Sequence, residues 1–427
     1  MAEPGTTATA RPDAAATSRA FLALILMLTF AMNTVGRGVT ETFAVFLLPV
    51  EKALGATRSE ITLTYSIYML VHGCAAPFAG QLIDRLGARA TYGAGLACLG
   101  AGYVLAGSAT TLWHYYAAAG VLGGLGASCL GMVAASSLLS RWFTSRMGSV
   151  MSVPYAAVGA GVLVIPPLTQ LLLQSYGWQT AHRVIGWGVL ALLPLLIALP
   201  LARVTAGAPG WRGARQVSIA EGKEVWTLRS ALRTKAFWGM FGAYFGTSVA
   251  AYSVLPQSVA YLVERGVDPL FAASAFGMTG ALSAVGIIAM GWISDRVGKV
   301  RAVTVSYIST IAGTLSLLLV TWFPSPLLVY GFVVLFGIMQ GVRGPVIVTL
   351  VATLYRGGAV GSIFGAMSLA LGLGAAIGSW LSGYLREVTG DYTLSFLFAV
   401  AGSVLGLGLF WGVRSLRTER LDATDRP

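Results

Sequence analysis

The chain has 427 residues, of which 56% are hydrophobic and only 10% are charged. Soluble domains carry about 25% charged residues, so this composition excludes a soluble enzyme, a disulfide-stabilised scaffold and a disordered regulator. Lysine and arginine outnumber aspartate and glutamate by 28 to 16, which gives a formal net charge of +12.

The predicted elements begin after a polar segment. Residues 1–19 are rich in Ala, Thr and Pro and lack periodicity, so we expect a disordered cytoplasmic tail. Twelve apolar stretches follow, and unbroken apolar runs of this length indicate helices, because a bilayer offers no water to satisfy the backbone. In chain order they cover 20–48, 61–83, 90–108, 112–138, 149–173, 182–202, 236–262, 270–293, 302–322, 326–353, 360–384 and 393–413.

The longest polar stretch, residues 203–235, divides the apolar stretches six and six. We therefore predict an all-α membrane protein with twelve transmembrane helices, arranged as two pseudo-symmetric six-helix bundles at 20–202 and 236–413. Residues 203–235 are expected to form a cytoplasmic linker between the bundles, and 414–427 a second cytoplasmic tail.

The distribution of basic residues predicts the orientation. If the N-terminus is cytoplasmic, the inner segments hold 21 lysines and arginines and the outer loops hold 5. Loops rich in lysine and arginine stay on the cytoplasmic side, so both termini are predicted to face the cytoplasm in a multi-pass protein of the inner (plasma) membrane. The net charge is thereby explained without nucleic acid.

The two halves repeat each other. Gly80–Gly87 contains Asp84-Arg85, and Gly291–Gly298 contains Asp295-Arg296 at the same places. Six further glycines of the first half recur in the second half at a common offset of 213 residues. Parallel repeats of this kind predict a binding site between the halves, near the middle of the membrane.

With its GxxxDRxG loop repeated in both halves, the chain resembles the major facilitator superfamily over nearly its whole length. Within that superfamily it is similar to the branch of monocarboxylate transporters and oxalate/formate antiporters. The resemblance implies alternating access around a cavity lined by helices 1, 4, 7 and 10. Many members of the branch carry a basic residue in the eighth helix. The corresponding stretch here, 270–293, contains none, so the substrates of those members cannot be assigned to this chain. The segments similar to the branch are Phe43–Phe46 with Pro49, Ala56–Glu60, Arg141–Gly148 and Gly383–Tyr392.

The repeated loops are candidates for gating. An acid among basic groups at the closing interface can form charge-assisted hydrogen bonds that hold one access state. The alternative is that the arginines only anchor each loop in the cytoplasm. The gating candidates are Asp84, Arg85, Arg89, Asp295, Arg296 and Arg301.

Three charged residues, Arg37, Glu41 and Arg343, lie within the apolar spans away from their ends. Such residues usually face a cavity or a partner, because each costs roughly 2.5–3.5 kcal/mol on insertion scales. Arg37 and Glu41 are four residues apart and can pair on one helix face, either structurally or as part of a site. Arg343 has no acid on its own helix, which makes a substrate carboxylate a natural partner.

We interpret Glu41, the only carboxylate inside the spans, as the proton carrier, with His72 as its rival. The alternative for His72 is a neutral histidine hydrogen-bonded across helices. His182 is expected near the membrane interface. The substrate-binding candidates are Arg343, Arg37, Asn33, Tyr65, Tyr68, Tyr155, Tyr252, Gln257 and Gln340, and Tyr244 also fits the cavity.

The sequence therefore predicts a secondary transporter of a small organic anion, a mono- or dicarboxylate, driven by proton symport. Anion exchange without protons and efflux of drugs or metabolites are the alternatives. The spans lack the clustered acids, histidines and nucleophiles of a membrane enzyme. Cys74, Cys98 and Cys129 are isolated, so no metal or cofactor is expected. The expected partners are the anion, protons and the lipid bilayer, and we expect a functional monomer.

Overall fold

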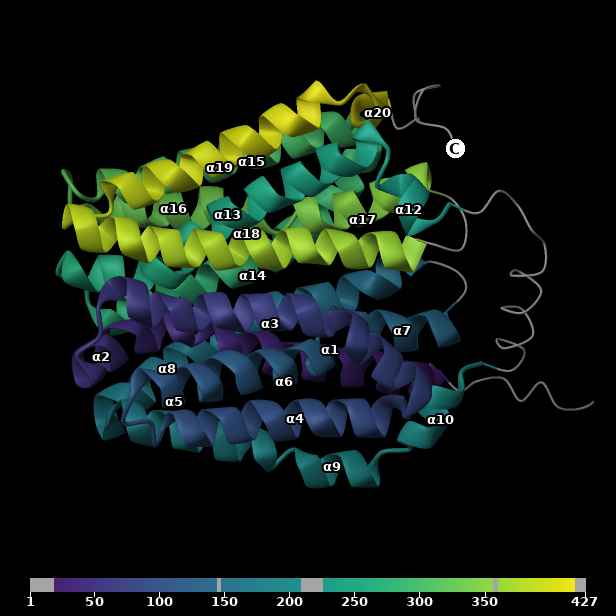
Figure 1. Ribbon diagram of the computed structural model, residues 1–427, viewed down its shortest axis with the longest axis horizontal. Helices are drawn as coiled ribbons and strands as arrows, with labels where there is room; N and C mark the ends of the chain where they lie inside the picture. The colour runs from purple at the N-terminus through teal and green to yellow at the C-terminus, as the bar shows by residue number, and fades with distance from the viewer. Residues whose placement is uncertain (1–18, 144–146, 209–225, 356–359, 419–427) are drawn as a thin grey trace, which may run out of the picture.

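The computed structural model describes residues 19–143, 147–208, 226–355 and 360–418, and these segments are nearly all helical (Figure 1). The side chains of a few residues inside the helices, Asp295 among them, are also outside the description. The prediction of an all-α membrane protein is confirmed.

The first half of the chain forms one group of helices, which is the lower group in Figure 1. Its elements are α1 (Arg19–Glu41), α2 (Phe43–Leu54), α3 (Arg58–Arg85), α4 (Gly87–Ala106), α5 (Leu112–Tyr115), a π-helical segment η1 (Tyr116–Leu122), α6 (Gly123–Leu130), α7 (Met132–Trp142), α8 (Met147–Leu190), α9 (Leu193–Ala198) and α10 (Leu201–Ala206).

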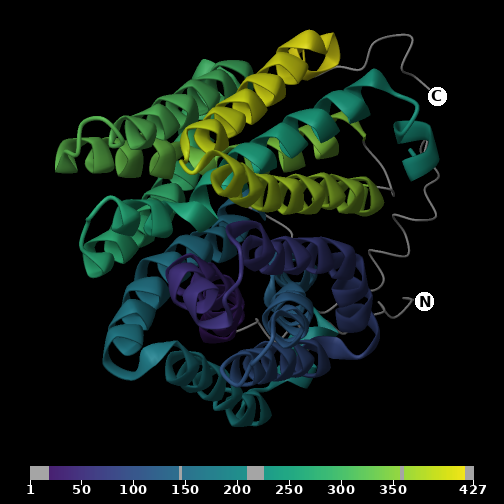
Figure 2. The same ribbon diagram turned by 60° about the vertical axis from the view of Figure 1, so that its left-hand side comes forward.

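The second half forms the upper group, and the turned view of Figure 2 keeps the two groups apart. Its elements are α12 (Leu228–Ala231), α13 (Lys235–Glu264), α14 (Pro269–Val297), α15 (Lys299–Leu319), α16 (Pro326–Gln340), α17 (Arg343–Leu354), α18 (Val360–Thr389), α19 (Thr393–Gly412) and α20 (Arg414–Thr418).

All twelve predicted spans are helical. Nine helical stretches within the described residues are long and apolar enough to cross a membrane. One of them contains two predicted spans, because α8 reverses its course at Gly177, which has φ +77° and ψ 168°. Glycine adopts this conformation without a steric penalty. The two remaining spans correspond to α4 and α13.

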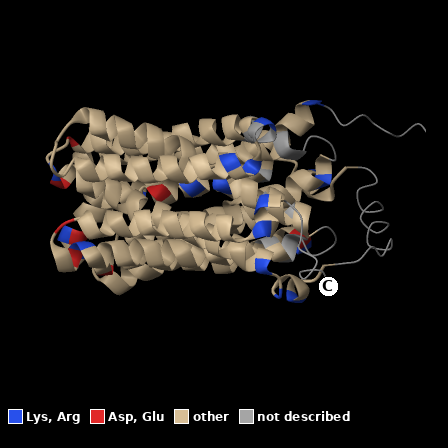
Figure 3. Ribbon diagram, turned by 90° about the horizontal axis from the view of Figure 1, so that it is seen from above, with Lys and Arg blue, Asp and Glu red and all other residues tan. Residues whose placement is uncertain are grey.

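We call the end of the molecule with α10, α12 and α20 the near end, and the end with α2 and α5 the far end (Figure 1). Lysine and arginine gather at the near end, whereas acidic and basic residues lie together at the far end (Figure 3). This distribution matches the charge asymmetry read from the sequence.

The turn between α2 and α3 is fixed by local chemistry and places Arg58 at the far end. Gly55 caps α2 with φ +60°, and Thr57 then starts α3 with a capping box. In that box the backbone N–H of Thr57 donates to Glu60 Oε2 at 2.8 Å, and Thr57 Oγ1 accepts from the backbone N–H of Glu60 at 3.3 Å. Arg58 is therefore held as the first residue of α3.

The two halves touch most extensively along two pairs of helices, α3 with α18 and α8 with α14, and α2 also packs against α13. Glycines bring the backbones close: a Cβ added at Gly73 would lie 3.4 Å from Cα of Gly372, and one added at Gly159 would overlap the carbonyl oxygen of Gly280. Small residues permit such close approach of membrane helices. From these central contacts α3 and α18 stay together toward the far end, where Ser66 Oγ donates to the carbonyl of Ala376 at 2.7 Å.

Candidate functional site

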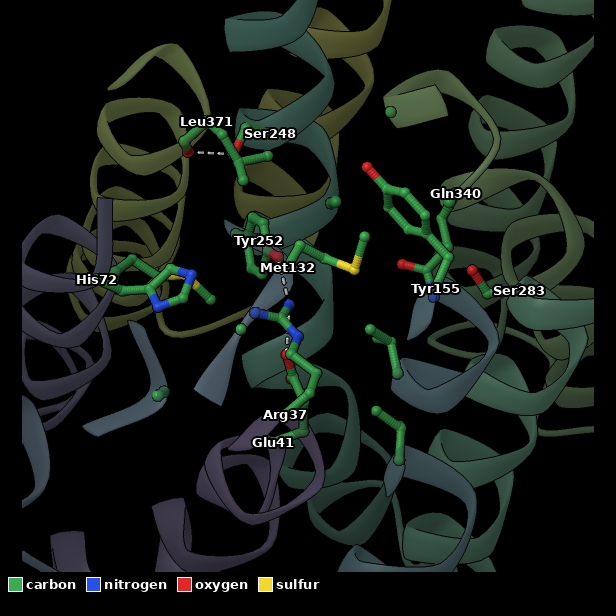
Figure 4. Close-up of a pocket in the computed structure, with 18 of the residues that line it drawn as sticks. Arg37, Glu41, His72, Met132, Tyr155, Ser248, Tyr252, Ser283, Gln340 and Leu371 are labelled. Carbon is green, nitrogen blue, oxygen red and sulfur yellow. Dashed lines mark hydrogen bonds and ion pairs between the residues drawn. The ribbon is translucent and has the colours of Figure 1, made fainter. Parts of the chain in front are cut away.

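A cavity of about 280 Å³ lies between the halves and is lined by residues of α1, α3, α6, α7, α8, α13, α14, α16, α17 and α18 (Figure 4). Its wall is mostly apolar, with a few polar groups that face inward. Small-molecule sites share this character, and their volumes begin at about 300 Å³. The cavity therefore suits a small solute.

Two interrupted helices contribute to the cavity wall. The fourth span breaks at Gly131, between α6 and α7, and the tenth span breaks between Gln340 and Arg343, where α16 ends and α17 begins. Gly131 and Gly344, which are equivalent in the repeat, both line the cavity. Interrupted helices at corresponding places of two repeats are typical of transporter binding sites.

Arg37 and Glu41 form the polar centre of the cavity. Arg37 Nη2 lies 2.6 Å from Glu41 Oε1, as the spacing on α1 predicts, and the same guanidinium donates to the hydroxyl of Tyr252 on α13 (Figure 4). On its far side Glu41 accepts a hydrogen bond from Tyr65 at 3.1 Å. Arg37 thus links the halves while its charge is compensated by Glu41.

Other predicted residues surround this pair. His72 lines the cavity with its ring stacked on Tyr68 at 5.9 Å, and its Nδ1 has no hydrogen-bond partner within the described residues. Asn33 also lines the cavity, and its amide donates to the carbonyl of Thr29 at 2.9 Å. Tyr155 and Gln340 lie across the cavity from His72 (Figure 4). Tyr68, Tyr244 and Tyr252 complete the predicted residues that line it.

Three predicted substrate ligands do not line the cavity. Tyr65 lies behind Glu41 as its hydrogen-bond donor. Gln257 is fully buried, and its Oε1 accepts from Arg58 at 3.2 Å, because it lies beyond Tyr252 toward the far end of α13. Arg343 is 1% exposed and packs on the ring of Tyr307. In this structure these three side chains lie outside the cavity lining, and their role as substrate ligands stays a prediction.

Arg58 is the centre of a second polar cluster, at the far end, that the sequence analysis did not identify. Its Nε contacts Glu51 Oε2 of the same half at 2.9 Å. From the other half, Glu264 Oε1 lies 2.6 Å from Nη2, and Tyr392 Oη accepts from Nη1 at 2.7 Å. Glu264 also binds Arg386 at 3.0 Å. We call Arg58, Glu51, Glu264, Arg386 and Tyr392, with Gln257, the far-end cluster.

The sequence contained a signal for this cluster. Arg58 and Arg386 are two of the five basic residues counted in the outer loops, and Glu51 and Glu264 lie in outer connections too, Glu51 in the one that contains Arg58. Glu264 lies just beyond the predicted span 236–262. Burial raises the pKa of Glu264, but Arg58 and Arg386 lower it by more, so that it falls below its ordinary value of 4.5. The carboxylate form, which the cluster requires, is thereby favoured.

At the near end, Asp84 is paired with Arg141 of α7 at 2.5 Å. Arg141 also donates to the carbonyl of Thr205 at 2.7 Å, so this pair lies inside the first half. Arg89 donates to the carbonyl of Leu199 at 3.3 Å. Arg85, Arg296 and Arg301 are exposed there, and the side chain of Asp295 lies outside the described residues.

His182 was expected at the interface but is only 1% exposed, so that expectation is wrong. Its Nδ1 lies 2.9 Å from the carbonyl of Trp178 and its Nε2 lies 3.2 Å from the hydroxyl of Tyr115. Within the described residues, no three metal-ligating side chains form a group that could hold an ion.

Comparison with known proteins shows both family and fold. A family model described as Major Facilitator Superfamily matches residues 21–379. Monocarboxylate transporter 13 of Rattus norvegicus is 29% identical to the chain over 408 residues, which cover 93% of this chain and 91% of that protein. Monocarboxylate transporter 11 of Homo sapiens is 27% identical over 400 residues, covering 89% and 81%.

A bacterial relative and a solved structure extend this result. Uncharacterized MFS-type transporter YcxA of Bacillus subtilis (strain 168) is 27% identical over 399 residues, covering 90% of this chain and 92% of that protein. The crystal structure of a D-xylose-proton symporter matches 94% of this chain and 100% of its own with a TM-score of 0.72, at 14% sequence identity. At that identity the match shows the shared fold.

Proposed function

Because the chain belongs to the major facilitator superfamily and is a transporter rather than an enzyme, we propose that it carries a small organic anion, a mono- or dicarboxylate, across the membrane. One observation supports this above the others: among the described residues that line the central cavity, Arg37 is the only lysine or arginine. A guanidinium in a largely apolar cavity matches a carboxylate in charge and in bidentate geometry. The names of the monocarboxylate transporters among its relatives agree with this class of substrate.

We further propose that substrate binding and protonation are coupled through Glu41. In the structure Arg37 is neutralised by Glu41 at 2.6 Å. A substrate carboxylate that binds Arg37 competes with Glu41, and a buried carboxylate that loses its counter-charge takes up a proton. The proton then travels with the anion, which is symport. His72, which also lines the cavity, is the rival proton carrier.

The neutral Arg37–Glu41 pair also bears on the alternative of anion exchange. An obligatory exchanger must hinder the return of the empty carrier. Here Glu41 compensates the charge of Arg37 within the protein, which removes one electrostatic barrier to that return. Efflux of cationic drugs fits less well, because Glu41 is the only acid among the described cavity residues and is occupied by Arg37.

We assign the far end to the outside of the cell, since the basic residues gather at the near end (Figure 3). The far-end cluster then closes the outer side of the cavity, and alternating access requires that it open during the cycle.

Uptake into proteoliposomes tests this function. We expect the parent protein to accumulate labelled lactate, pyruvate, oxalate or succinate when the outside is acidic. Arg37→Gln should raise the half-saturating concentration by about 30-fold or more, the equivalent of one charge-assisted hydrogen bond of about 2 kcal/mol or more. Glu41→Gln should abolish accumulation driven by the pH gradient but keep exchange of internal for external substrate.

Arg183→Gln is the matched control, because Arg183 is exposed and outside the cavity. Normal uptake by Arg37→Gln at normal expression would contradict the role of Arg37. Accumulation that survives in Glu41→Gln would leave Glu41 as a structural partner of Arg37 and direct attention to His72.

A further inference from the structure

Arg343 is a buried charge without a counter-charge. It is the largest side chain in the described residues that is buried almost completely, at 1% exposure. Its Nε, Nη1 and Nη2 have no hydrogen-bond partner within the part of the chain that the structure describes. Among the described residues, the ring of Tyr307 lies over the guanidinium, with its centroid 4.5 Å from the guanidinium carbon. A cation–π contact offsets only part of the cost of burying a guanidinium whose donors are unsatisfied.

Among the described residues, no carboxylate is placed to complete it. Glu41 is the only acid inside the predicted spans, and it is already bound by Arg37 and Tyr65. The helix that carries Arg343 contains no acid, nor does α15, which carries Tyr307. This environment suits an anion that comes from outside the protein.

Arg343 lies one layer behind the cavity wall. Its neighbours Gln340, Gly341 and Gly344 line the cavity. The hydroxyl of Tyr307 is 2.7 Å from Oγ1 of Thr247, which lines the cavity as well. The ring of Tyr307 thus holds the guanidinium next to residues that line the cavity.

Open space lies next to Arg343 along the chain. Arg343 is the first residue of α17, next to the interruption of the tenth span. A Cβ added at Gly344 would meet only the hydroxyl of Tyr244, at 3.7 Å, so the space beside this interruption is open.

We propose that Arg343 binds the carboxylate of the transported anion after leaving the ring of Tyr307. This assignment rests on the proposed transport of an organic anion. The anion is then held between Arg343 of the second half and Arg37 of the first half, whose partner Glu41 takes up the proton. An anion held by Arg343 alone leaves the Arg37–Glu41 pair intact, whereas one that also reaches Arg37 displaces Glu41.

Thermal unfolding of the purified full-length protein tests the assignment. Unfolding is followed with rising concentrations of lactate, succinate and, separately, sodium chloride. Arg343→Met keeps the volume of the side chain and removes the unsatisfied charge. We expect it to raise the Tm of the ligand-free protein by a few degrees, because an apolar replacement for a buried charge stabilises the fold. We also expect it to remove the rise in Tm caused by the carboxylate, which selective binding produces in the parent.

Arg343→Lys serves as a second variant that keeps the charge but loses the bidentate fork, and we expect its half-saturating concentration to rise about 10-fold. Arg183→Met is the exposed control and should behave as the parent. A carboxylate shift preserved in Arg343→Met, together with a lower Tm without ligand, would overturn the assignment in favour of a structural role.

The remaining outcomes are equally decisive. If sodium chloride raised the Tm of the parent as much as the carboxylates do, the site would be one for inorganic anions, and the carboxylate assignment would be overturned. The absence of a shift with every carboxylate in the parent would contradict the proposed function, and the role of Arg343 with it. A shift in the parent that Arg343→Met retains contradicts only the role of Arg343.

Discussion

The two ends of the molecule use their ion pairs differently. At the far end, Arg58 of the first half is bound by Glu264 and Tyr392 of the second half, and Arg386 binds the same Glu264. At the near end, Asp84 and Arg141 both belong to the first half. The difference teaches that similar ion pairs can join different parts of the fold: the far-end cluster joins the two halves, whereas the Asp84–Arg141 pair joins α3 and α7 within the first half.

Loss of Arg58 should have the largest effect on the contact between the two halves at the far end. Arg58 is 6% exposed, and its removal leaves Glu264 and Glu51 without their main counter-charge. We expect Arg58→Gln to destabilise the closed far end by about 3 kcal/mol, as for other buried pairs that lose one partner. Spin labels on Lys52→Cys and Thr389→Cys, in a protein without native cysteines, would report a longer distance between the halves.

Arg183→Gln, which lies outside the cluster, should leave that distance distribution unchanged. An unchanged distribution in Arg58→Gln would show that the glycine contacts alone close the far end, and the far-end cluster would lose its proposed role.

The two glutamates that bind Arg58 separate contacts between the halves from contacts within one half. Glu264 links the halves through Arg58 and Arg386, whereas Glu51 binds Arg58 from the same half. Glu264→Gln should therefore open the far end measurably, by about 1–2 kcal/mol, and Glu51→Gln should open it much less. The pair of spin labels described above measures both, and equal effects would contradict a role that depends on bridging.

Acidification offers a related test in the parent. The pKa of Glu264 lies below its ordinary value of 4.5, so its stabilisation of the closed far end is present above that value and is lost as the pH falls below it. The labelled parent should keep its short distance at pH 5 and 6. Opening already at pH 6 would require a different titrating group.

The smallest structural effect is expected at the near end. The side chain of Asp84 is 47% exposed, so its pair with Arg141 contributes only about 0–1 kcal/mol. Asp84→Asn should leave the far-end distance and the equilibrium affinity for substrate nearly unchanged while it slows transport. Substrate affinity by thermal shift and initial uptake rates together measure this, and a complete loss of binding in a well-folded variant would place Asp84 in the site.

The fold was predictable from the sequence because only helices or closed barrels can span a bilayer. Unbroken runs of about 20 apolar residues predicted helices, and the glycines that recur at a constant offset predicted that the two halves repeat each other. The interruption at Gly131 was not predicted, and the turn between the predicted spans 149–173 and 182–202 was not assigned to Gly177, because each feature depends on the backbone conformation of one residue.

The site was predictable only where its geometry is local. The spacing of Arg37 and Glu41 along one helix predicted their pair, but the contact of Arg37 with Tyr252 depends on how α1 meets α13. Gln257 was misplaced because hydropathy does not reveal how far along α13 the cavity extends. Arg343 was recognised as unusual from its lack of an acid, but its position on Tyr307 depends on the packing of α15 against α17.

The contact of Gly73 with Gly372 has a mechanical consequence. Arg58 lies fifteen residues along α3 from this contact, a lever of about 22 Å at ~1.5 Å per residue. A rotation of about 10° at the glycine contact would move the tip of this lever by about 4 Å, given that length. That displacement separates Arg58 from Glu264, Tyr392 and Gln257 in a single step. The contacts of the far-end cluster should therefore break together once the tilt reaches a threshold angle. At smaller angles the contacts should persist and return the two halves to the closed position.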